Sequence, residues 1–245
     1  MKTALITGAS SGVAQALAST LSAQGWSLCL VCRDQSRLDP ALGHLHSADV
    51  STEAGAQAAL AAAIAAFGSV PNAVINCAGS SLIAPIGRTS ESQYRAVLSA
   101  NLDTAFFVSK AYASVLVGAK QGGALLLFSS VVAAIGVSNH TAIAAAKGGV
   151  EALTRSLAAD FSGICLRVNC IAPGLTRTPM TVRMLGNEAA ARQIAAQYPL
   201  GRHGEATDAA ALAAFLVSDA SGWITGQVIG VDGGFSAVRP YVKAV

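Results

Sequence analysis

The residues best placed for chemistry form a glycine-rich turn near the start of the sequence. The run Thr7–Ala14 (TGASSGVA) follows a short apolar segment and precedes a helical pattern. Gly8 permits a tight turn, and Gly12 lets a phosphate approach the backbone closely. The free amides and the dipole at a helix start attract its negative charge. The spacing therefore predicts a pyrophosphate site. Its expected residues are Gly8, Ser10, Ser11, Gly12 and Val13.

Two other pairs have spacings that can indicate chemistry. Cys29-x-x-Cys32 has the spacing of a redox pair, but it lies in a predicted strand, where residues three apart point to opposite faces. His44 and His46 share one strand face, but no Cys, Asp or Glu clusters with them in the sequence. We therefore expect neither a redox pair nor a metal site.

Strand patterns alternate with helical patterns along the whole chain. The predicted strands are residues 3–6, 27–32, 44–48, 73–76, 124–129, 166–171 and 227–231. The predicted helices are 12–24, 52–67, 90–117 (one long helix or two abutting ones), 141–161, an irregular 180–197, and 208–217. Such alternation requires right-handed crossovers and a parallel sheet covered by helices on both faces. We predict one doubly wound α/β domain of the Rossmann type, with about seven strands, over residues 1–245.

The composition excludes several classes of protein. The 245 residues are 53% hydrophobic and only 12% charged, which excludes intrinsic disorder and predicts that subunits cover part of the surface. The net charge is +3 with no basic segment, so we expect no nucleic-acid binding. The longest apolar run, residues 58–67, is too short to cross a membrane, and no signal-peptide core follows Lys2. We expect a cytoplasmic protein.

The ordered set of motifs resembles the short-chain dehydrogenase/reductase family from residue 1 to about 235, and its 3-oxoacyl-carrier-protein reductases in overall pattern. Besides the glycine-rich turn, the matching segments are 49–50, 76–79, Asn101, 129–130, Lys147, 169–176, 226–228 and 231–234. The resemblance implies that Asp49 contacts the adenine of a nicotinamide dinucleotide, that Val50 supports it, and that Thr176 touches the carboxamide. The further residues implied to line the cofactor are Asn76, Ala78, Gly79, Pro173 and Gly174.

The end of the second predicted strand indicates which cofactor is used. In NAD enzymes a carboxylate there accepts the ribose hydroxyls. This chain has Cys32 followed by Arg33, and the guanidinium can pair with a 2′-phosphate. Arg33 could instead be a solvated turn residue paired with Asp34. We predict that NADP(H) is preferred over NAD(H).

The implied catalytic set departs from the family at one position. Lys147, Ser130 and Asn101 match the family's Lys, Ser and Asn, but the Tyr position, four residues before Lys147, is Ile143. By the resemblance, Lys147 holds the nicotinamide ribose, Ser130 hydrogen-bonds the substrate oxygen, and Asn101 holds a relay water. Ile143 has no proton to give, and losing a positioned general acid costs about 10²–10⁴ in rate.

Four side chains are candidates for the missing proton donor. His140 lies seven residues before Lys147, a spacing that resembles the Tyr–Lys pair of the family's enoyl reductases, and it is otherwise a helix-cap residue. Tyr198 could approach the substrate or pack its own segment. Tyr241 could reach a neighbouring subunit's site or anchor the tail. Lys147 could act directly or through water bound to Asn101.

A substrate lid is expected at about 175–205, followed later by a tail at 236–245. The lid arginines suit the phosphates of an acyl carrier or CoA, or are solvated: Arg177, Arg183, Arg192 and Arg202. Met180, Met184 and Leu185 form an apolar substrate wall or pack on the sheet. The predicted helices 90–117 and 141–161 match those through which the family forms tetramers. The apolar residues expected to be exposed there are Ala111, Ala113, Val115, Ala152, Leu153 and Leu157.

We therefore predict an NADP(H)-dependent oxidoreductase that forms a homotetramer or dimer. It would move hydride to or from a carbonyl, an alcohol or an activated C=C of a small apolar or acyl-thioester substrate, with an unconventional proton source. The alternative is a nucleotide-binding homologue that no longer catalyses and acts as a cofactor sensor or partner subunit. Ile143 favours this alternative, whereas Ser130, Asn101 and Lys147 favour the enzyme.

Overall fold

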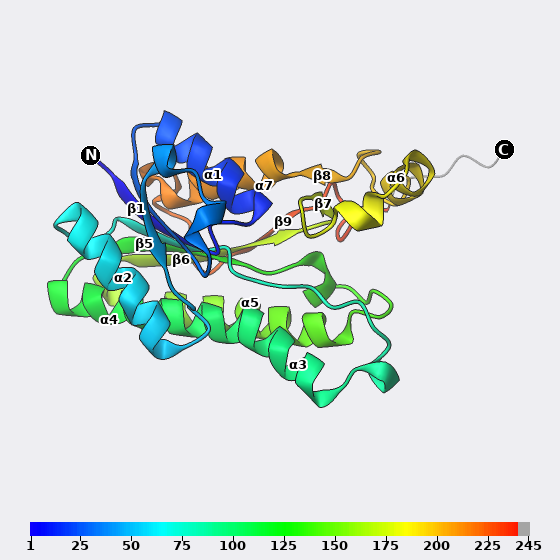
Figure 1. Cartoon of the computed structure of the whole chain (residues 1–245), viewed down its shortest axis with the longest axis horizontal. Helices are drawn as coiled ribbons and strands as arrows, with labels where there is room; N and C mark the ends of the chain where they lie inside the picture. Colours follow the sequence, from blue (N-terminus) through cyan, green and yellow to red (C-terminus); the bar gives the residue numbers. More distant parts are fainter. Residues whose placement is uncertain (240–245) are drawn as a thin grey trace.

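The central element of the computed structural model is a seven-stranded parallel sheet (Figure 1), and the structure describes residues 1–239. The sheet order is β3-β2-β1-β4-β5-β6-β9, and β7 and β8 form a separate two-stranded sheet. The strands are β1 (Thr3–Thr7), β2 (Ser27–Cys32), β3 (His44–Ser47), β4 (Ala73–Asn76), β5 (Gly123–Phe128), β6 (Leu166–Pro173), β7 (Thr176–Arg177), β8 (Gly204–Glu205) and β9 (Val228–Val231). The helices are α1 (Gly12–Ala23), α2 (Glu53–Phe67), α3 (Glu91–Leu98), α4 (Thr104–Ala119), α5 (Thr141–Asp160), α6 (Glu188–Ala195) and α7 (Ala206–Val217).

Helices cover both faces of the sheet, as Figure 1 shows. One apolar cluster joins α1 and α7 to one face, and a second joins α2, α4 and α5 to the other. Strands β1 and β4 are buried along their whole length, as expected for strands covered on both sides. The strand order reverses between β1 and β4, and ligands of such folds bind at the carboxyl ends beside that point. The predicted fold class is confirmed.

Side-chain caps explain where several helices begin. The Thr52 hydroxyl accepts the Gly55 amide at 3.1 Å at the start of α2. At the start of α3, the Ser90 hydroxyl accepts the Gln93 amide at 3.2 Å, and the Gln93 side chain accepts the Ser90 amide at 2.9 Å. This reciprocal pair is the predicted capping box.

The predicted helix at 90–117 is two helices joined by a π-helical turn, Ser99–Asp103. By length and composition alone the stretch Glu91–Ala119 could cross a membrane, so residues 58–67 are not the strongest candidate span. However, 44% of its most apolar window is buried, because α4 packs on the sheet and on α2. The predicted irregular helix at 180–197 is also divided, and Asn187 caps α6 by accepting the Ala190 amide at 2.9 Å.

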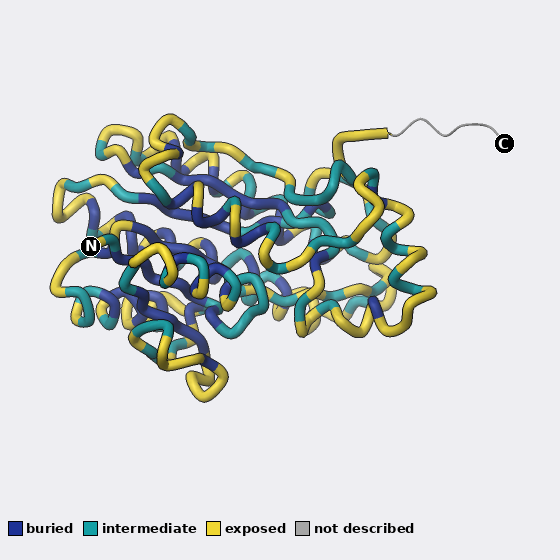
Figure 2. The backbone as a smooth tube through the Cα atoms, turned by 90° about the horizontal axis from the view of Figure 1, so that it is seen from above, coloured by how far each residue is buried: buried dark blue, intermediate teal, exposed yellow. Residues whose placement is uncertain are grey.

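The helices expected to expose apolar residues bury three of those six residues in their own chain. Ala113 is 1% exposed, and Ala111 and Leu157 are each 9% exposed, so the expectation of free apolar surface was wrong at these positions. Val115 and Leu153 are half-buried, and Ala152 is exposed. Figure 2 shows the same distribution, with burial concentrated in the sheet and exposure at the lid end.

The cysteine pair and the histidine pair whose spacing can indicate chemistry both lie on strands, as predicted. Cys29 and Cys32 are buried free thiols on β2, and burial raises the pKa of Cys29 to about 11. His44 and His46 lie on β3. Within residues 1–239, no three His, Cys, Asp or Glu side chains come together as a metal site.

Candidate functional site

The glycine-rich turn sits where β1 meets the end of β4. Gly8 has φ +64°, and a Cβ there would overlap the backbone of Ala78, so only glycine fits. The Thr7 hydroxyl donates to the Asn76 side-chain oxygen at 2.6 Å, and the Asn76 amide donates to Thr104 at 3.3 Å. Asn76 thus fixes the turn with its side chain and is itself 2% exposed. Ala78 and Gly79 follow Asn76 in the chain, just beyond the carboxyl end of β4.

The start of α1 carries the groups that are predicted to bind a pyrophosphate. The Ser11 hydroxyl accepts the Ala14 amide at 3.3 Å as the helix cap. Ser10, Gly12 and Val13 are half-buried around it. The backbone amides of a first helical turn have no partner within the helix and can bind an anion.

The lid begins directly over this helix start. A Cβ at Gly12 would lie 3.1 Å from Thr178 Cγ2 and 3.2 Å from Pro179 Cδ. Thr176, by contrast, is 7% exposed and donates its hydroxyl to the Gly174 carbonyl at 3.1 Å. Thr178 is therefore a site residue that the sequence reasoning missed. Its signal was its place two residues beyond Thr176, after the Pro173-Gly174 turn.

The residues predicted for the adenosine end come together beside β2 and β3. Arg33 is exposed, and its carbonyl accepts the Ser47 hydroxyl at 2.8 Å. The Ser51 hydroxyl and amide hold the pKa of the Asp49 carboxyl below its usual range, and the Arg33 charge acts in the same direction. Val50 is 6% exposed and belongs to the apolar cluster that joins α2, α4 and α5 to the sheet.

A second arginine, which the sequence reasoning also missed, lies near this end. Arg37 lines a cavity of about 300 Å³ whose wall includes Ala9 of the glycine-rich turn and Gln15 of α1. Its charge acts on Asp34, whose pKa is held down mainly by the Ser36 hydroxyl. Only the folded loop 33–43 brings Arg37 back to the turn, because Arg37 lies 28 positions after Ala9 in the chain.

Lys147 is buried at the centre of the site. Its Nζ donates to the Phe128 carbonyl at 2.7 Å, and the residue is 7% exposed. Burial lowers the pKa of Lys147 from 10.5 to about 8, although the nearby thiols of Cys170 and Cys77 act in the opposite direction. An amine of this pKa exchanges protons readily near neutral pH.

Asn101 faces the same space from the π-helical turn. It is fully buried, and its Nδ2 donates to the Val97 carbonyl at 2.9 Å and to the Ser80 carbonyl at 3.2 Å. A Cβ on Gly79 would lie 2.9 Å from Asn101 Oδ1 and 3.6 Å from Lys147 Nζ. Because Gly79 has no side chain, its backbone can lie close to both polar groups.

Ser130 and Ile143 have contrasting surroundings. Ser130 is half-buried after β5, and its hydroxyl accepts the Val132 amide at 3.4 Å. Ile143 is 4% exposed in an apolar cluster that includes Val132 and Leu82. The position of the expected acid is therefore filled by hydrocarbon.

The other proposed proton donors have local partners. His140 begins α5 without a side-chain cap, and its Nδ1 lies 2.7 Å from the Ser138 carbonyl, which fixes that nitrogen as the donor. The Tyr198 hydroxyl accepts the Leu175 amide at 2.7 Å, and its ring stacks on Phe235 at 4.8 Å. These contacts favour the packing interpretation of Tyr198. Tyr241 lies outside the described residues.

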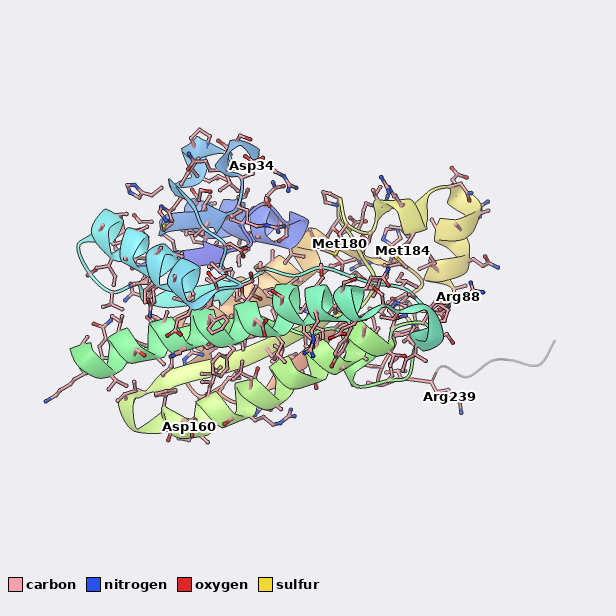
Figure 3. The ribbon with its side chains drawn as sticks, turned by 60° about the horizontal axis from the view of Figure 1, so that its bottom comes forward. Asp34, Arg88, Asp160, Met180, Met184 and Arg239 are labelled. Atoms are coloured by element: carbon pink, nitrogen blue, oxygen red, sulfur yellow. The ribbon has the colours of Figure 1, made fainter. Side chains whose placement is uncertain are left out.

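Ion pairs hold the segment that the sequence predicts to be the lid. Arg177 pairs with Glu205 at 3.3 Å, Arg192 with Glu188 at 3.0 Å, and Arg202 with Asp208 at 2.6 Å. These exposed pairs favour the interpretation that Arg177, Arg192 and Arg202 are solvated surface residues and not ligands of a substrate phosphate. Met180 and Met184 are 53% and 39% exposed on the lid, as labelled in Figure 3, whereas Leu185 is buried.

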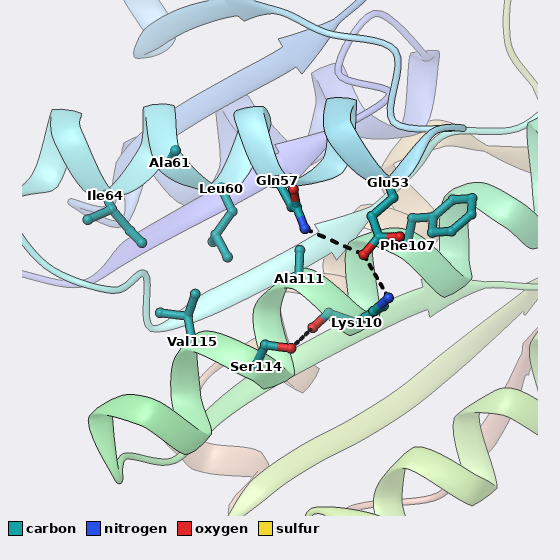
Figure 4. A pocket seen from close by; sticks show the side chains of 10 residues that line it. All are labelled: Glu53, Gln57, Leu60, Ala61, Ile64, Phe107, Lys110, Ala111, Ser114 and Val115. Carbon is teal, nitrogen blue, oxygen red and sulfur yellow. Dashed lines mark hydrogen bonds and ion pairs between the residues drawn. The ribbon is translucent and has the colours of Figure 1, made fainter.

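A groove on another part of the surface borders none of these residues. It lies between α2 and α4, has a volume of about 230 Å³, and is crossed by the Lys110–Glu53 ion pair at 2.6 Å (Figure 4). Its floor is formed by hydrocarbon from residues such as Leu60 and Val115. We assign no chemistry to it.

Several known proteins are similar to this chain in sequence and in fold. A family profile described as "Enoyl-(Acyl carrier protein) reductase" matches residues 8–236. Galactitol 2-dehydrogenase (L-tagatose-forming) of Cereibacter sphaeroides is 34% identical over 95% of this chain and 94% of its own. The inactive 2-(S)-hydroxypropyl-CoM dehydrogenase 2 of Xanthobacter autotrophicus is 34% identical over 87% of this chain and 96% of its own. The structure of a short-chain type dehydrogenase/reductase from Mycobacterium ulcerans matches with a TM-score of 0.91 at 31% identity, covering 97% of this chain and 90% of that one.

Proposed function

The chain belongs to the short-chain dehydrogenase/reductase family and is an oxidoreductase, and on that premise we propose that it transfers hydride between NADP(H) and a carbonyl or activated C=C. The substrate is small and apolar or an acyl thioester, in keeping with the exposed Met180 and Met184 of the lid. The cofactor, when bound, supplies or accepts the hydride. The amides at the start of α1 would hold its pyrophosphate, and Lys147 its nicotinamide ribose.

NADP(H) is the cofactor that the charges favour. Arg33 is exposed beside Asp49, and Arg37 lines the cavity beside the glycine-rich turn. The residue at the end of β2 is the neutral, buried Cys32, whose thiol donates to the Asp34 carbonyl at 3.0 Å. No carboxylate of β2 itself therefore competes for the ribose hydroxyls.

The proton comes from water held between Lys147 and Asn101, not from residue 143. The observation that carries this proposal is that Asn101 Oδ1 and Lys147 Nζ both lie close to Gly79, at 2.9 Å and 3.6 Å from the position of a Cβ there. When hydride reaches the substrate carbon, the excess electron pair on the oxygen, or on the α-carbon of an enolate, takes one proton from this water. Lys147 then restores the proton to the water. Ser130 orients the substrate oxygen by a hydrogen bond.

A glycine pair tests this route. In Gly79→Ala the new methyl group would crowd Asn101 Oδ1 at 2.9 Å and lie 3.6 Å from Lys147 Nζ, whereas Gly87→Ala is the matched control, since nothing lies within 4 Å of its added Cβ. We expect NADPH oxidation to fall at least tenfold in Gly79→Ala and to stay unchanged in the control, measured with ketones, 3-oxoacyl thioesters and enones. Equal turnover in both variants would exclude a proton route through water between Asn101 and Lys147.

Assembly and location are part of the same proposal. We expect a cytoplasmic homotetramer or dimer, supported by exposed apolar side chains such as Phe106 on α4 and Trp223 after α7, which are 49% and 100% exposed. A monomer by solution mass measurement at micromolar concentration would contradict the assembly. Nothing in the charge pattern favours nucleic acid as a partner.

The second candidate function is nucleotide binding without turnover. It is favoured by Ile143 in its apolar cluster and by the similarity to a relative that is named inactive. Tight NADPH binding with no oxidation by any compound of the panel would establish it.

A further inference from the structure

A carboxylate outside the expected catalytic set contacts the segment that carries Ser130. Glu151 lies on α5 one turn after Lys147 and is half-buried. The Ser129 hydroxyl donates to Glu151 Oε1 at 2.8 Å. Ser129 is 4% exposed, and its amide donates to the Ile171 carbonyl of β6 at 2.8 Å. This one residue therefore joins the end of β5 to both β6 and α5.

The hydroxyl of Ser129 has two acceptors within reach and one proton. The Lys147 carbonyl lies at 3.3 Å, and the Glu151 carboxylate at 2.8 Å. A hydrogen bond to a charged acceptor is about twice as strong as a neutral one, so the Ser129 hydroxyl donates its proton to the hydrogen bond with the Glu151 carboxylate. The carboxylate in turn needs such a partner, because half-burial removes part of its water.

Two links thus connect the strand end to the helix turn. One is the bond from Lys147 Nζ to the Phe128 carbonyl, and the other is the Ser129–Glu151 bond. If Lys147 turns toward a bound ribose, the first link weakens. The second link remains, because neither Ser129 nor Glu151 is among the residues proposed to hold the cofactor. It sets how far Ser130 lies from Lys147, although 16 residues separate them in the chain.

We propose that Glu151 is a positioning residue, which acts through Ser129 to hold Ser130 and Lys147 at the spacing required for hydride transfer. This inference rests on the proposed function for its purpose, but its geometry can be tested without turnover. A loss of about 1 Å in alignment can cost about 10²-fold in rate, so a tie of this kind is worth a measurable amount of activity.

The test compares Glu151→Ala, Ser129→Ala and the double variant with Glu151→Gln, whose amide oxygen still accepts the Ser129 proton. Asp160→Ala, on the exposed last turn of the same helix, is the matched control for lost helix charge. The first measurement is the rate at which an amine-reactive ester labels Lys147, followed by mass spectrometry from pH 7 to 10. We expect labelling to rise about threefold or more in both alanine variants, with no further rise in the double variant. Glu151→Gln and the control should label like the wild type.

The second measurement is the NADPH dissociation constant and, where turnover is found, kcat and KM. We expect kcat to fall about tenfold in the alanine variants with KM nearly unchanged, and Glu151→Gln to recover most of it. Unchanged labelling and unchanged kcat in Glu151→Ala, alongside a lowered melting temperature, would show a merely structural bond and overturn the inference. A wild type without turnover would contradict the proposed function instead, and the labelling result would still decide the role of Glu151.

Discussion

Restoring a hydroxyl at residue 143 would test how much of the catalytic site is intact. Ile143 is 4% exposed and packs against Val132 and Leu82 near the segment that carries Ser130. Tyrosine is larger, and overpacking a well-packed cluster costs about 1–3 kcal/mol of stability. The matched variant is Ile143→Phe, which has nearly the same bulk as Ile143→Tyr but no proton to donate. The difference between the two variants therefore isolates the hydroxyl.

The expected gain in rate follows from general acid catalysis. Lys147 lies one helical turn beyond residue 143, and its buried cation would stabilise a phenolate and lower the pKa of a tyrosine hydroxyl. A positioned acid contributes about 10²–10⁴ in rate. Because the proposed route through water would already supply a proton, we expect the lower end, about 10²-fold in kcat for ketone reduction by Ile143→Tyr relative to Ile143→Phe.

The assay is NADPH oxidation followed at 340 nm with saturating ketone, together with thermal unfolding of both variants. Both variants should lose similar stability, and only Ile143→Tyr should gain rate. Equal rates in two folded variants that bind NADPH would refute the reasoning, because they would mean that the substrate oxygen does not lie beside residue 143.

Three further perturbations have defined outcomes. Arg33→Ala should weaken NADPH binding by about 10–100-fold, the worth of a charged hydrogen bond, and leave NADH binding nearly unchanged; equal losses for both nucleotides would remove Arg33 from the phosphate site. Lys147→Met should be more stable than the wild type at pH 7 by about 3 kcal/mol, since burial lowers the Lys147 pKa from 10.5 to about 8. The cost of burying the charged Lys147 is full below pH 8 and disappears as the pH rises to 10.5. The free energy of unfolding of the wild type should therefore rise across this pH window, whereas that of Lys147→Met should not. Parallel pH profiles of the two proteins in chemical unfolding would contradict the lowered pKa. Tyr198→Phe should cost about 1–3 kcal/mol by leaving the Leu175 amide unpaired, while turnover stays within about twofold; a large loss of kcat would instead make Tyr198 a proton donor.

The strand and helix order was readable in the sequence because local patterns determine it. Ser90 and Gln93 form the predicted capping box, and apolar runs such as β4 became buried central strands. The π-helical turn at Ser99–Asp103 was not readable, since nothing in its sequence distinguishes it from the continuous helix that 90–117 suggests. It depends on tertiary contacts, among them the bonds from Asn101 to the backbone of Ser80.

The site was predictable only where a motif carries its residues. Lys147, Asn101 and Gly79 were found through the family pattern, and the structure brings the three residues close together. Thr178 and Glu151 lie outside that pattern and depend on how distant segments fold together. Ala113 and Leu157 were wrongly predicted to be exposed. The apolar composition of a helix does not reveal whether its apolar face packs on the sheet of its own chain or on a second subunit.

The central claim is hydride transfer without an acid at residue 143, and one measurement addresses it directly. NADPH and NADH would first be titrated by nicotinamide fluorescence, and NADPH oxidation by the wild-type chain would then be measured with ketones, 3-oxoacyl thioesters and enones. We predict tighter binding of NADPH than of NADH, and stoichiometric formation of a reduced product from at least one class of compound. Tight binding with no oxidation by any of them, in the wild type and in Ile143→Tyr alike, would contradict the claim.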